Sequence, residues 1–132
     1  MTLIRSKTLS DAAQYAYAAT APADARMIFL AGSCPLNEDG TTASEGNYAA
    51  QAAKCIENMK VALHEAGASI DDVISTRVLV ASAKQADLVS AWEVVRDAFE
   101  AHAVPPSTLL GVTVLGYDNQ LVEVEAIAAV SD

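Results

Sequence analysis

The chain is poor in the residues on which metal and disulfide chemistry depend. It contains two cysteines, Cys34 and Cys55, and two histidines in 132 residues. The cysteines have no CxxC spacing and no nearby histidine, so we expect no metal site, and a structural disulfide would be unusual in a reducing cytosol. We interpret both cysteines as small buried hydrophobic residues.

Positive charge is also scarce. Eight lysines and arginines stand against seventeen aspartates and glutamates, which gives a formal net charge of −9, and no run of basic residues occurs. Such a surface repels phosphate backbones and anionic lipid headgroups. We therefore expect no nucleic acid and no membrane among the partners of this protein.

Long apolar runs and common catalytic motifs are absent as well. No stretch approaches the roughly 20 apolar residues that a membrane-spanning helix needs, and Met1–Lys7 has no apolar core behind its charges. We therefore expect no signal peptide and a cytoplasmic location. The sequence has no glycine-rich phosphate loop, and it supports neither a Ser-His-Asp nor a Cys-His arrangement.

What is present is the pattern of an α+β domain. The chain is 52% hydrophobic and 19% charged, and its length is typical of a single domain, which we expect to cover residues 1–132. Apolar residues recur at three- and four-residue spacing along two predicted helices. The first runs from about Gly46 to Ala66 and ends at Gly67. The second opens at Ser82, with Gln85 at the spacing of a capping box.

Six segments have the composition of strands. Met27–Ala31 is a continuous apolar run, as expected for a strand buried on both sides, and Val73–Val80 is rich in β-branched residues. Ser107–Leu115 and Leu121–Val130 flank the turn sequence Gly116–Gln120, so we expect a strand pair joined by that turn. The two remaining segments are Leu3–Leu9 and Gln14–Thr20.

The order of these elements predicts that part of the sheet needs a partner. Two helices can cover only one face of the sheet. The last strand, however, has apolar side chains on both faces, with Val122 and Val124 on one face and Leu121 and Ile127 on the other. Because the uncovered face must be buried elsewhere, we predict a homo-oligomer.

The last strand also carries the strongest candidates for chemistry. Alternation along a strand places Glu123 and Glu125 on one face, together with Leu121 and Ile127. Acids that lie among apolar neighbours and close to each other resist ionisation, which would make one of them a proton carrier near neutral pH. The alternatives are a solvated strand face or ion pairs across a subunit interface. Arg77, in the middle of a strand, either pairs with an acid across the sheet or points into a site.

Several stretches of the chain together resemble a known family. They are Met27–Gly32 followed by Pro35, Gln51 and Asn58 on the first helix, Ala66–Ser69 with Asp71–Val73, Pro105–Thr108, and Leu121–Ala128. In this order and spacing the chain resembles the Rid (reactive intermediate deaminase, YjgF-like) family, whose members are also called L-PSP-like proteins or translation-inhibitor endoribonucleases. The resemblance spans nearly the whole chain, and Glu-Val-Glu-Ala-Ile-Ala in the last strand is its most specific part.

The resemblance implies a fold, an assembly and a reaction. The fold is chorismate-mutase-like α+β, a mixed sheet with two helices on one face. The assembly is a homotrimer whose sheets pack inside and whose three clefts between subunits bind a small-molecule ligand. The best-known activity of the family is hydrolysis of enamines and imines made by pyridoxal-phosphate enzymes. It releases ammonia and a 2-keto acid without a metal or cofactor, so we expect no cofactor here.

The resemblance also implies site residues. Glu123 matches the glutamate that positions the attacking water. Tyr17 matches the cleft tyrosine, with Tyr15 as a rival because of a nearby insertion, and Gly32 matches the glycine whose backbone lines the cleft. The other expected substrate-binding residues are Ser33, Ser107 and Thr108.

Four positions depart from the pattern of the typical deaminases. Ser107 stands where they carry an arginine that clamps the carboxylate of the substrate, and serine cannot perform that bidentate task. Leu109 replaces a cleft cysteine, Ala31 replaces a cleft serine, and Trp92 or Glu93 replaces a helix asparagine. The chain therefore resembles a branch of the family without the substrate-binding arginine.

Three functions are open from the sequence. The first is a cofactor-free hydrolase or deaminase of a small metabolite, with Glu123 as general base; Arg26 and Arg77 are the candidates to replace the missing arginine. The second is a non-catalytic trimer that binds a small ligand or regulates a partner. The third is an endoribonuclease, which the net charge of −9 and the lack of a histidine-based catalytic set disfavour.

Overall fold

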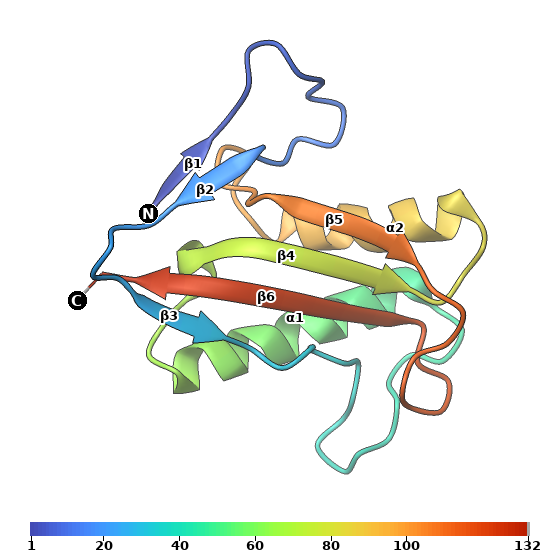
Figure 1. The fold of residues 1–132 in the computed structure, drawn as a ribbon. Coiled ribbons are helices and arrows are strands. Elements are labelled where there is room, and N and C mark those ends of the chain that lie inside the picture. Colours follow the sequence, from blue (N-terminus) through green and yellow to red (C-terminus); the bar gives the residue numbers. More distant parts are fainter. Residues whose placement is uncertain (132) are drawn as a thin grey trace.

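A four-stranded sheet with two helices on one face forms the body of the protein (Figure 1). The structure, a computed structural model, describes residues 1–131. A small two-stranded sheet adjoins one end of the body. The elements are β1 (Thr2–Ile4), β2 (Ala18–Thr20), β3 (Arg26–Phe29), α1 (Tyr48–Glu65), a 3-10 helix (Ile70–Asp72), β4 (Val73–Val80), α2 (Gln85–Asp97), β5 (Ser107–Gly111) and β6 (Val122–Val130).

The main sheet has the strand order β3–β6–β4–β5. β6 pairs antiparallel with both β3 and β4, whereas β5 pairs with β4 in parallel. The expected strand pair of Ser107–Leu115 with Leu121–Val130 is therefore wrong, because β4 lies between β5 and β6. Parallel strands need a crossover connection, and α2 supplies it between β4 and β5.

The core lies between the sheet and the helices. Alternate residues of β4 and β6 face α1 and α2 and are buried, as their period-two pattern predicts. The helices contribute one apolar stripe each, as expected from the sequence. The largest fully buried apolar side chains include Met59, Leu63, Val78, Val95, Val122 and Val124.

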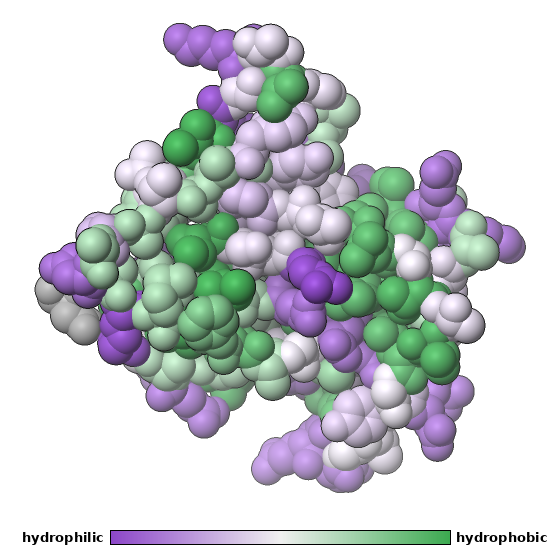
Figure 2. Space-filling model, in the orientation of Figure 1, coloured by the Kyte–Doolittle hydropathy of each residue, from purple (hydrophilic) through white to green (hydrophobic). Residues whose placement is uncertain are grey.

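The opposite face of the sheet, which we call the open face, has no helix over it (Figure 1). Met27 and Phe29 lie there, 42% and 73% exposed, so within this single chain only Ile28 of β3 is buried. We expected Met27–Ala31 to be buried on both sides, and a single copy of the chain buries only one side of this strand. Figure 2 shows hydrophobic surface at both ends of this face, over β3 and near the end of β5, with hydrophilic surface between them.

The helix ends differ in how well the sequence predicts them. Asn47 caps α1, since its side chain accepts a 2.9 Å hydrogen bond from the backbone N–H of Ala50. The capping box expected at Ser82 and Gln85 is wrong. Lys84 is the N-cap residue of α2, and the Ser82 hydroxyl instead accepts a hydrogen bond from the Lys84 N–H (3.0 Å) and donates one to Asp87 (2.7 Å).

No helix within residues 1–131 is long and apolar enough to cross a membrane.

A buried glutamine fixes the turn that leads into β6. Gln51, on α1, is fully buried. Its Oε1 accepts a hydrogen bond from the backbone N–H of Leu121 (2.7 Å), and its Nε2 donates to the carbonyl of Asn119 (3.0 Å). The helix thereby holds the chain just before Glu123 in place.

Replacing Gln51 by leucine is expected to lower the free energy of unfolding by about 1–3 kcal/mol, because two backbone groups of the turn lose their partner. Urea unfolding at fixed protein concentration measures this loss. Lys60→Leu, at an exposed position of the same helix, is the matched control and should unfold like the parent protein. An unchanged midpoint for Gln51→Leu would show that Gln51 does not hold the turn.

Candidate functional site

The chain that follows β3 runs along β6 and meets Glu123. Ser33 and Val124 exchange two backbone hydrogen bonds, of 2.7 Å from the Ser33 N–H and 3.0 Å from the Val124 N–H. This pairing continues the β3–β6 ladder past the end of β3. It places Gly32 and Cys34 beside the side chain of Glu123, which lies half-buried on the open face.

Gly32 allows the carboxyl group of Glu123 to approach the backbone closely. A Cβ atom added at position 32 would collide with the carboxylate, lying 2.8 Å from Cδ and 3.1 Å from Cγ of Glu123. Any other residue would therefore displace the glutamate or the loop. Close contact therefore requires a glycine at position 32, where the carboxylate lies against the backbone.

Two side chains donate hydrogen bonds to the same oxygen of this carboxylate. The thiol of Cys34 donates to Oε1 of Glu123 at 3.2 Å, and Nε2 of Gln120 donates to that atom at 3.2 Å. Burial, followed by the hydrogen bond to Glu123 and its negative charge, raises the pKa of Cys34 to about 11. The thiol is therefore protonated at neutral pH and acts as a donor.

The segment that carries Cys34 is itself anchored to α1. Nδ2 of Asn58 donates to the carbonyls of Cys34 and Leu36, both at 2.9 Å. Cys55, also on α1, is fully buried and donates to the carbonyl of Val122 at 3.5 Å; burial raises its pKa. Cys55 thus behaves as the buried hydrophobic residue expected from the sequence, whereas Cys34 is only partly buried and contacts the candidate site.

Glu125, the second acid of the strand, has a different partner. Its Oε1 lies 3.1 Å from Nε of Arg77, which is directly opposite on β4. The pair borders a surface pocket of about 270 Å³ on the open face, with Phe29, Ser75 and Ile127 among its other walls. Arg77 therefore makes the cross-sheet ion pair, and it also lines this pocket.

Ser107 and Thr108 point to opposite faces of β5. The hydroxyl of Ser107 donates to the carbonyl of Pro105 (2.9 Å) and lies 2.6 Å from the hydroxyl of buried Thr76. Thr108 is exposed and lies opposite Arg77, on the open face. Ser107 thus faces the helix side, and one copy of the chain does not bring it together with Glu123.

A small apolar cavity lies beside Ser107. It measures about 60 Å³ and is lined by Ala13, Tyr15, Trp92, Ser107 and Leu109. Trp92, one of the two residues that match the position of the helix asparagine, packs edge-on against Tyr15 with 6.0 Å between ring centroids. Its indole Nε1 is the one buried side-chain nitrogen or oxygen within residues 1–131 that has no hydrogen-bond partner. The walls therefore offer apolar contact and little charge.

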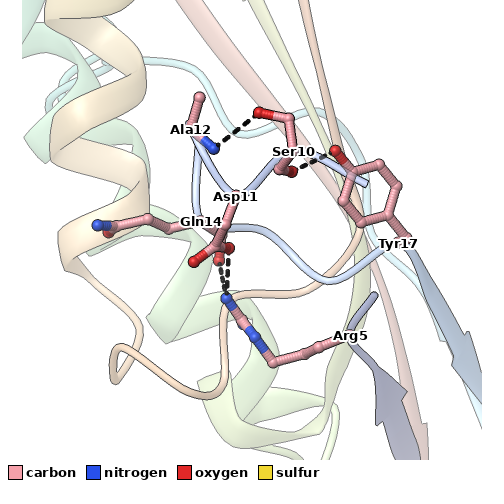
Figure 3. Close-up of polar contacts among 6 residues, drawn as sticks. All are labelled: Arg5, Ser10, Asp11, Ala12, Gln14 and Tyr17. Atoms are coloured by element: carbon pink, nitrogen blue, oxygen red, sulfur yellow. Dashed lines mark hydrogen bonds and ion pairs between the residues drawn. The ribbon is translucent and has the colours of Figure 1, made fainter. Parts of the chain in front are cut away.

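Tyr17 lies in the N-terminal segment rather than near Glu123. Its hydroxyl donates to the carbonyl of Ser10 at 2.5 Å (Figure 3). Arg5 braces the same segment through 3.0 Å contacts with Asp11 and with the carbonyl of Gln14. β2 follows Tyr17 directly and lies at the end of the main sheet away from the start of β6 (Figure 1).

Other candidate residues have structural partners or lie apart. Arg26 donates to the carbonyl of Ala66 at 3.1 Å, at the end of α1. Ser33 is buried and takes part in the backbone pairing with β6. No group of three metal-ligating side chains occurs within the described residues. Gln120 was missed from the sequence, because a polar residue in a turn is a common feature that carries no signal of a buried contact.

Comparison with known proteins identifies a family for this chain. The chain matches the family model for endoribonuclease L-PSP over residues 6–130. It is 34% identical to a RutC family protein of Pyrococcus abyssi over 102 residues, 77% of each chain.

Solved structures share the fold. A Rid-family protein of unknown function from Yersinia pestis, YyfB, superposes with a TM-score of 0.89 at 24% identity over 98% of each chain. A member of the YjgF/YER057c/UK114 family from Mycobacterium tuberculosis superposes with a TM-score of 0.65 at 28% identity, again over 98% of each chain. The chain therefore belongs to the Rid (YjgF-like) family, whose family model is described as endoribonuclease L-PSP, and it has the chorismate-mutase-like α+β fold.

Proposed function

We propose that this protein hydrolyses small imines or enamines in a cleft between subunits, with Glu123 as the general base. The observation that carries the proposal is the placement of the Glu123 carboxylate against the backbone of Gly32, half-buried and fixed by neighbouring donors. A carboxylate held in this way can take a proton from water without first reorganising.

The proposed reaction needs only proton transfers and one addition. Glu123 takes a proton from water as the water oxygen bonds to the imine carbon, and the carbon–nitrogen double bond becomes a single bond. Glu123 gives this proton to the nitrogen, which completes a carbinolamine. The carbinolamine hydroxyl then loses its proton, the nitrogen gains a second proton, the carbon–nitrogen bond breaks, and ammonia leaves as the carbonyl forms. The sum is one imine and one water giving one carbonyl compound and one ammonia. An enamine reaches the same path after its carbon is protonated to give the imine.

The walls around Ser107 favour a substrate without a carboxylate. The Ser107 hydroxyl already contacts Pro105 and Thr76, and the neighbouring cavity is lined by Tyr15, Trp92 and Leu109. A carboxylate placed there would lose its hydration without gaining a charged partner, which is unfavourable. We therefore propose neutral imines with an apolar substituent as the substrate class.

A homotrimer is part of the proposal. Glu123 lies on the open face, whereas Ser107 faces the helix side of the same sheet, so a second copy is needed to place a Ser107 cavity near a Glu123 carboxylate. Exposed Phe29 and Met27 on the open face are suited to such contacts. We propose that the cleft combines surfaces of two neighbouring copies in the cytoplasm.

A second function has support from the same cavity. Ser107 and Leu109, at the positions where the resemblance implies an arginine and a cysteine, line an apolar pocket, which suits a trimer that binds a small ligand without transforming it. An endoribonuclease has less support, because a net charge of −9 repels RNA.

Glu123→Gln should lower the rate of imine hydrolysis by about 10²–10⁴-fold, since the amide cannot accept the proton from water. An oxidase generates the imine in situ, and the assay measures the disappearance of the imine and the release of ammonia. Glu125→Gln is the matched control on the same strand and face, and it should retain most of the activity. Equal rates for Glu123→Gln and the parent protein would exclude Glu123 as the base.

Neutral imines should be better substrates than 2-imino acids of similar size. An amine oxidase supplies the neutral imines and an amino-acid oxidase supplies the 2-imino acids, and kcat/KM is compared between them. Leu109→Arg, which brings a cation to the cavity, should shift the preference toward 2-imino acids. A parent protein that prefers 2-imino acids would contradict the assignment of the Ser107 cavity to a neutral substrate.

Light scattering coupled to gel filtration should give three times the chain mass. Phe29→Glu should reduce the assembled fraction, because it places a charge on the apolar open face at a position that is 73% exposed in one copy. Val61→Glu, at a 55% exposed position of α1 on the helix side, should leave the mass unchanged. A parent protein of single-chain mass would rule out the trimer.

A further inference from the structure

The two oxygens of the Glu123 carboxylate have different surroundings. Oε1 accepts two hydrogen bonds, from the thiol of Cys34 and from Nε2 of Gln120, each at 3.2 Å. Oε2 lies beside the backbone of Gly32. Gln120 lies in the turn three residues before Glu123, whereas Cys34 comes from the segment after β3, far away in the sequence. The tertiary fold therefore brings Cys34 to the oxygen that Gln120 already contacts.

The orientation of Gln120 is fixed by its other contacts. The side chain is 4% exposed, and its Oε1 accepts from the backbone N–H of Tyr117 at 3.1 Å. Because an N–H can only donate, the amide oxygen must face Tyr117, which directs Nε2 toward Val122 and Glu123. Nε2 donates to the carbonyl of Val122 at 3.1 Å as well as to Glu123. The amide therefore presents a donor, never an acceptor, to the carboxylate.

Cys34 is also held in place by its neighbours, and its thiol is unreactive. Asn58 fixes its carbonyl at 2.9 Å, which limits the movement of the residue. The raised pKa of its thiol, about 11, keeps the sulfur protonated at neutral pH, so Cys34 is a poor nucleophile and a steady donor. A hydrogen bond to a carboxylate is a charge-assisted one and is stronger than its neutral counterpart.

We propose that Cys34 and Gln120 are positioning residues that hold Oε1 of Glu123 and thereby leave Oε2, beside Gly32, as the oxygen that takes the proton from water. This inference rests on the proposed hydrolytic function of Glu123. Neither residue touches the reacting atoms; both act by orienting the base. The two hydrogen bonds to Oε1 leave Oε2 as the carboxylate oxygen whose lone pairs are available. This role explains why a thiol and a buried amide lie beside Glu123.

The hydrogen bond from Cys34 can be tested without any substrate. The S–H stretching band of Cys34 is identified by its loss in Cys34→Ala, and infrared spectroscopy then follows it in variants. In Glu123→Gln the band should move to higher frequency, because a neutral amide is a weaker acceptor than a carboxylate. In Glu125→Gln it should not move. A band that is unchanged in Glu123→Gln would overturn the role of Cys34.

Kinetics test the orienting role with the best imine found for the parent protein. Cys34→Ala and Gln120→Leu should each lower kcat on the order of tenfold with little change in KM, whereas Cys34→Ser retains a donor and should restore most of kcat. Circular dichroism and assembled mass confirm that each variant is folded. Wild-type kcat in both Cys34→Ala and Gln120→Leu would overturn the inference. A parent protein that hydrolyses no imine would contradict the proposed function instead, and the infrared result would still decide whether Cys34 holds Oε1.

Discussion

Ser33 and Val124 exchange a pair of backbone hydrogen bonds just beyond the end of β3, and the candidate site is built around this pairing. It brings the segment after β3 onto the inner strand β6, so that Gly32 and Cys34 meet a carboxylate that is distant in sequence. Asn58 and Gln51 then fix the two segments from the helix side. Backbone pairing and the amide side chains of Asn58 and Gln51, rather than ion pairs, therefore determine where Glu123 lies.

The two faces of the sheet have separate roles. The helix side contains the core and the small cavity beside Ser107, and the open face carries Glu123, the Arg77–Glu125 pair and exposed Phe29. An uncovered sheet face with large apolar side chains is typical of a surface that another copy covers. The proposed cleft joins opposite faces of two copies.

Much of the fold follows from local patterns in the sequence. The alternation along β6 correctly separates buried Val122 and Val124 from Glu123 and Glu125, and the bounds of β4 are as expected. The pairing of β5 could not be read from its turn, because Gly116–Gln120 is suited to a hairpin and only the crossover through α2 reveals that β4 lies between the two strands.

The candidate site was only partly predictable for a related reason. Glu123 and Gly32 were identified from strand alternation and family resemblance, and the structure places them in contact. The contact of Cys34 depends on how the segment after β3 meets β6, which spacing in the sequence does not encode. The contact of Gln120 depends on the turn conformation that directs its side chain toward Glu123. The resemblance gave Tyr17 as the cleft tyrosine with Tyr15 as a rival, and of these two Tyr15 lines the Ser107 cavity. Which of them lies in the cleft stays a prediction.

Mixing two inactive variants tests most directly whether the site is shared between copies. Glu123→Gln lacks the base, and Leu109→Trp fills the cavity beside Ser107, so each should be inactive as a pure assembly. If one cleft combines Glu123 of one copy with the cavity of another, co-refolded mixtures contain some intact clefts and regain imine hydrolysis. Mixtures that stay as inactive as the separate variants, although mass spectrometry shows mixed trimers, would contradict the account.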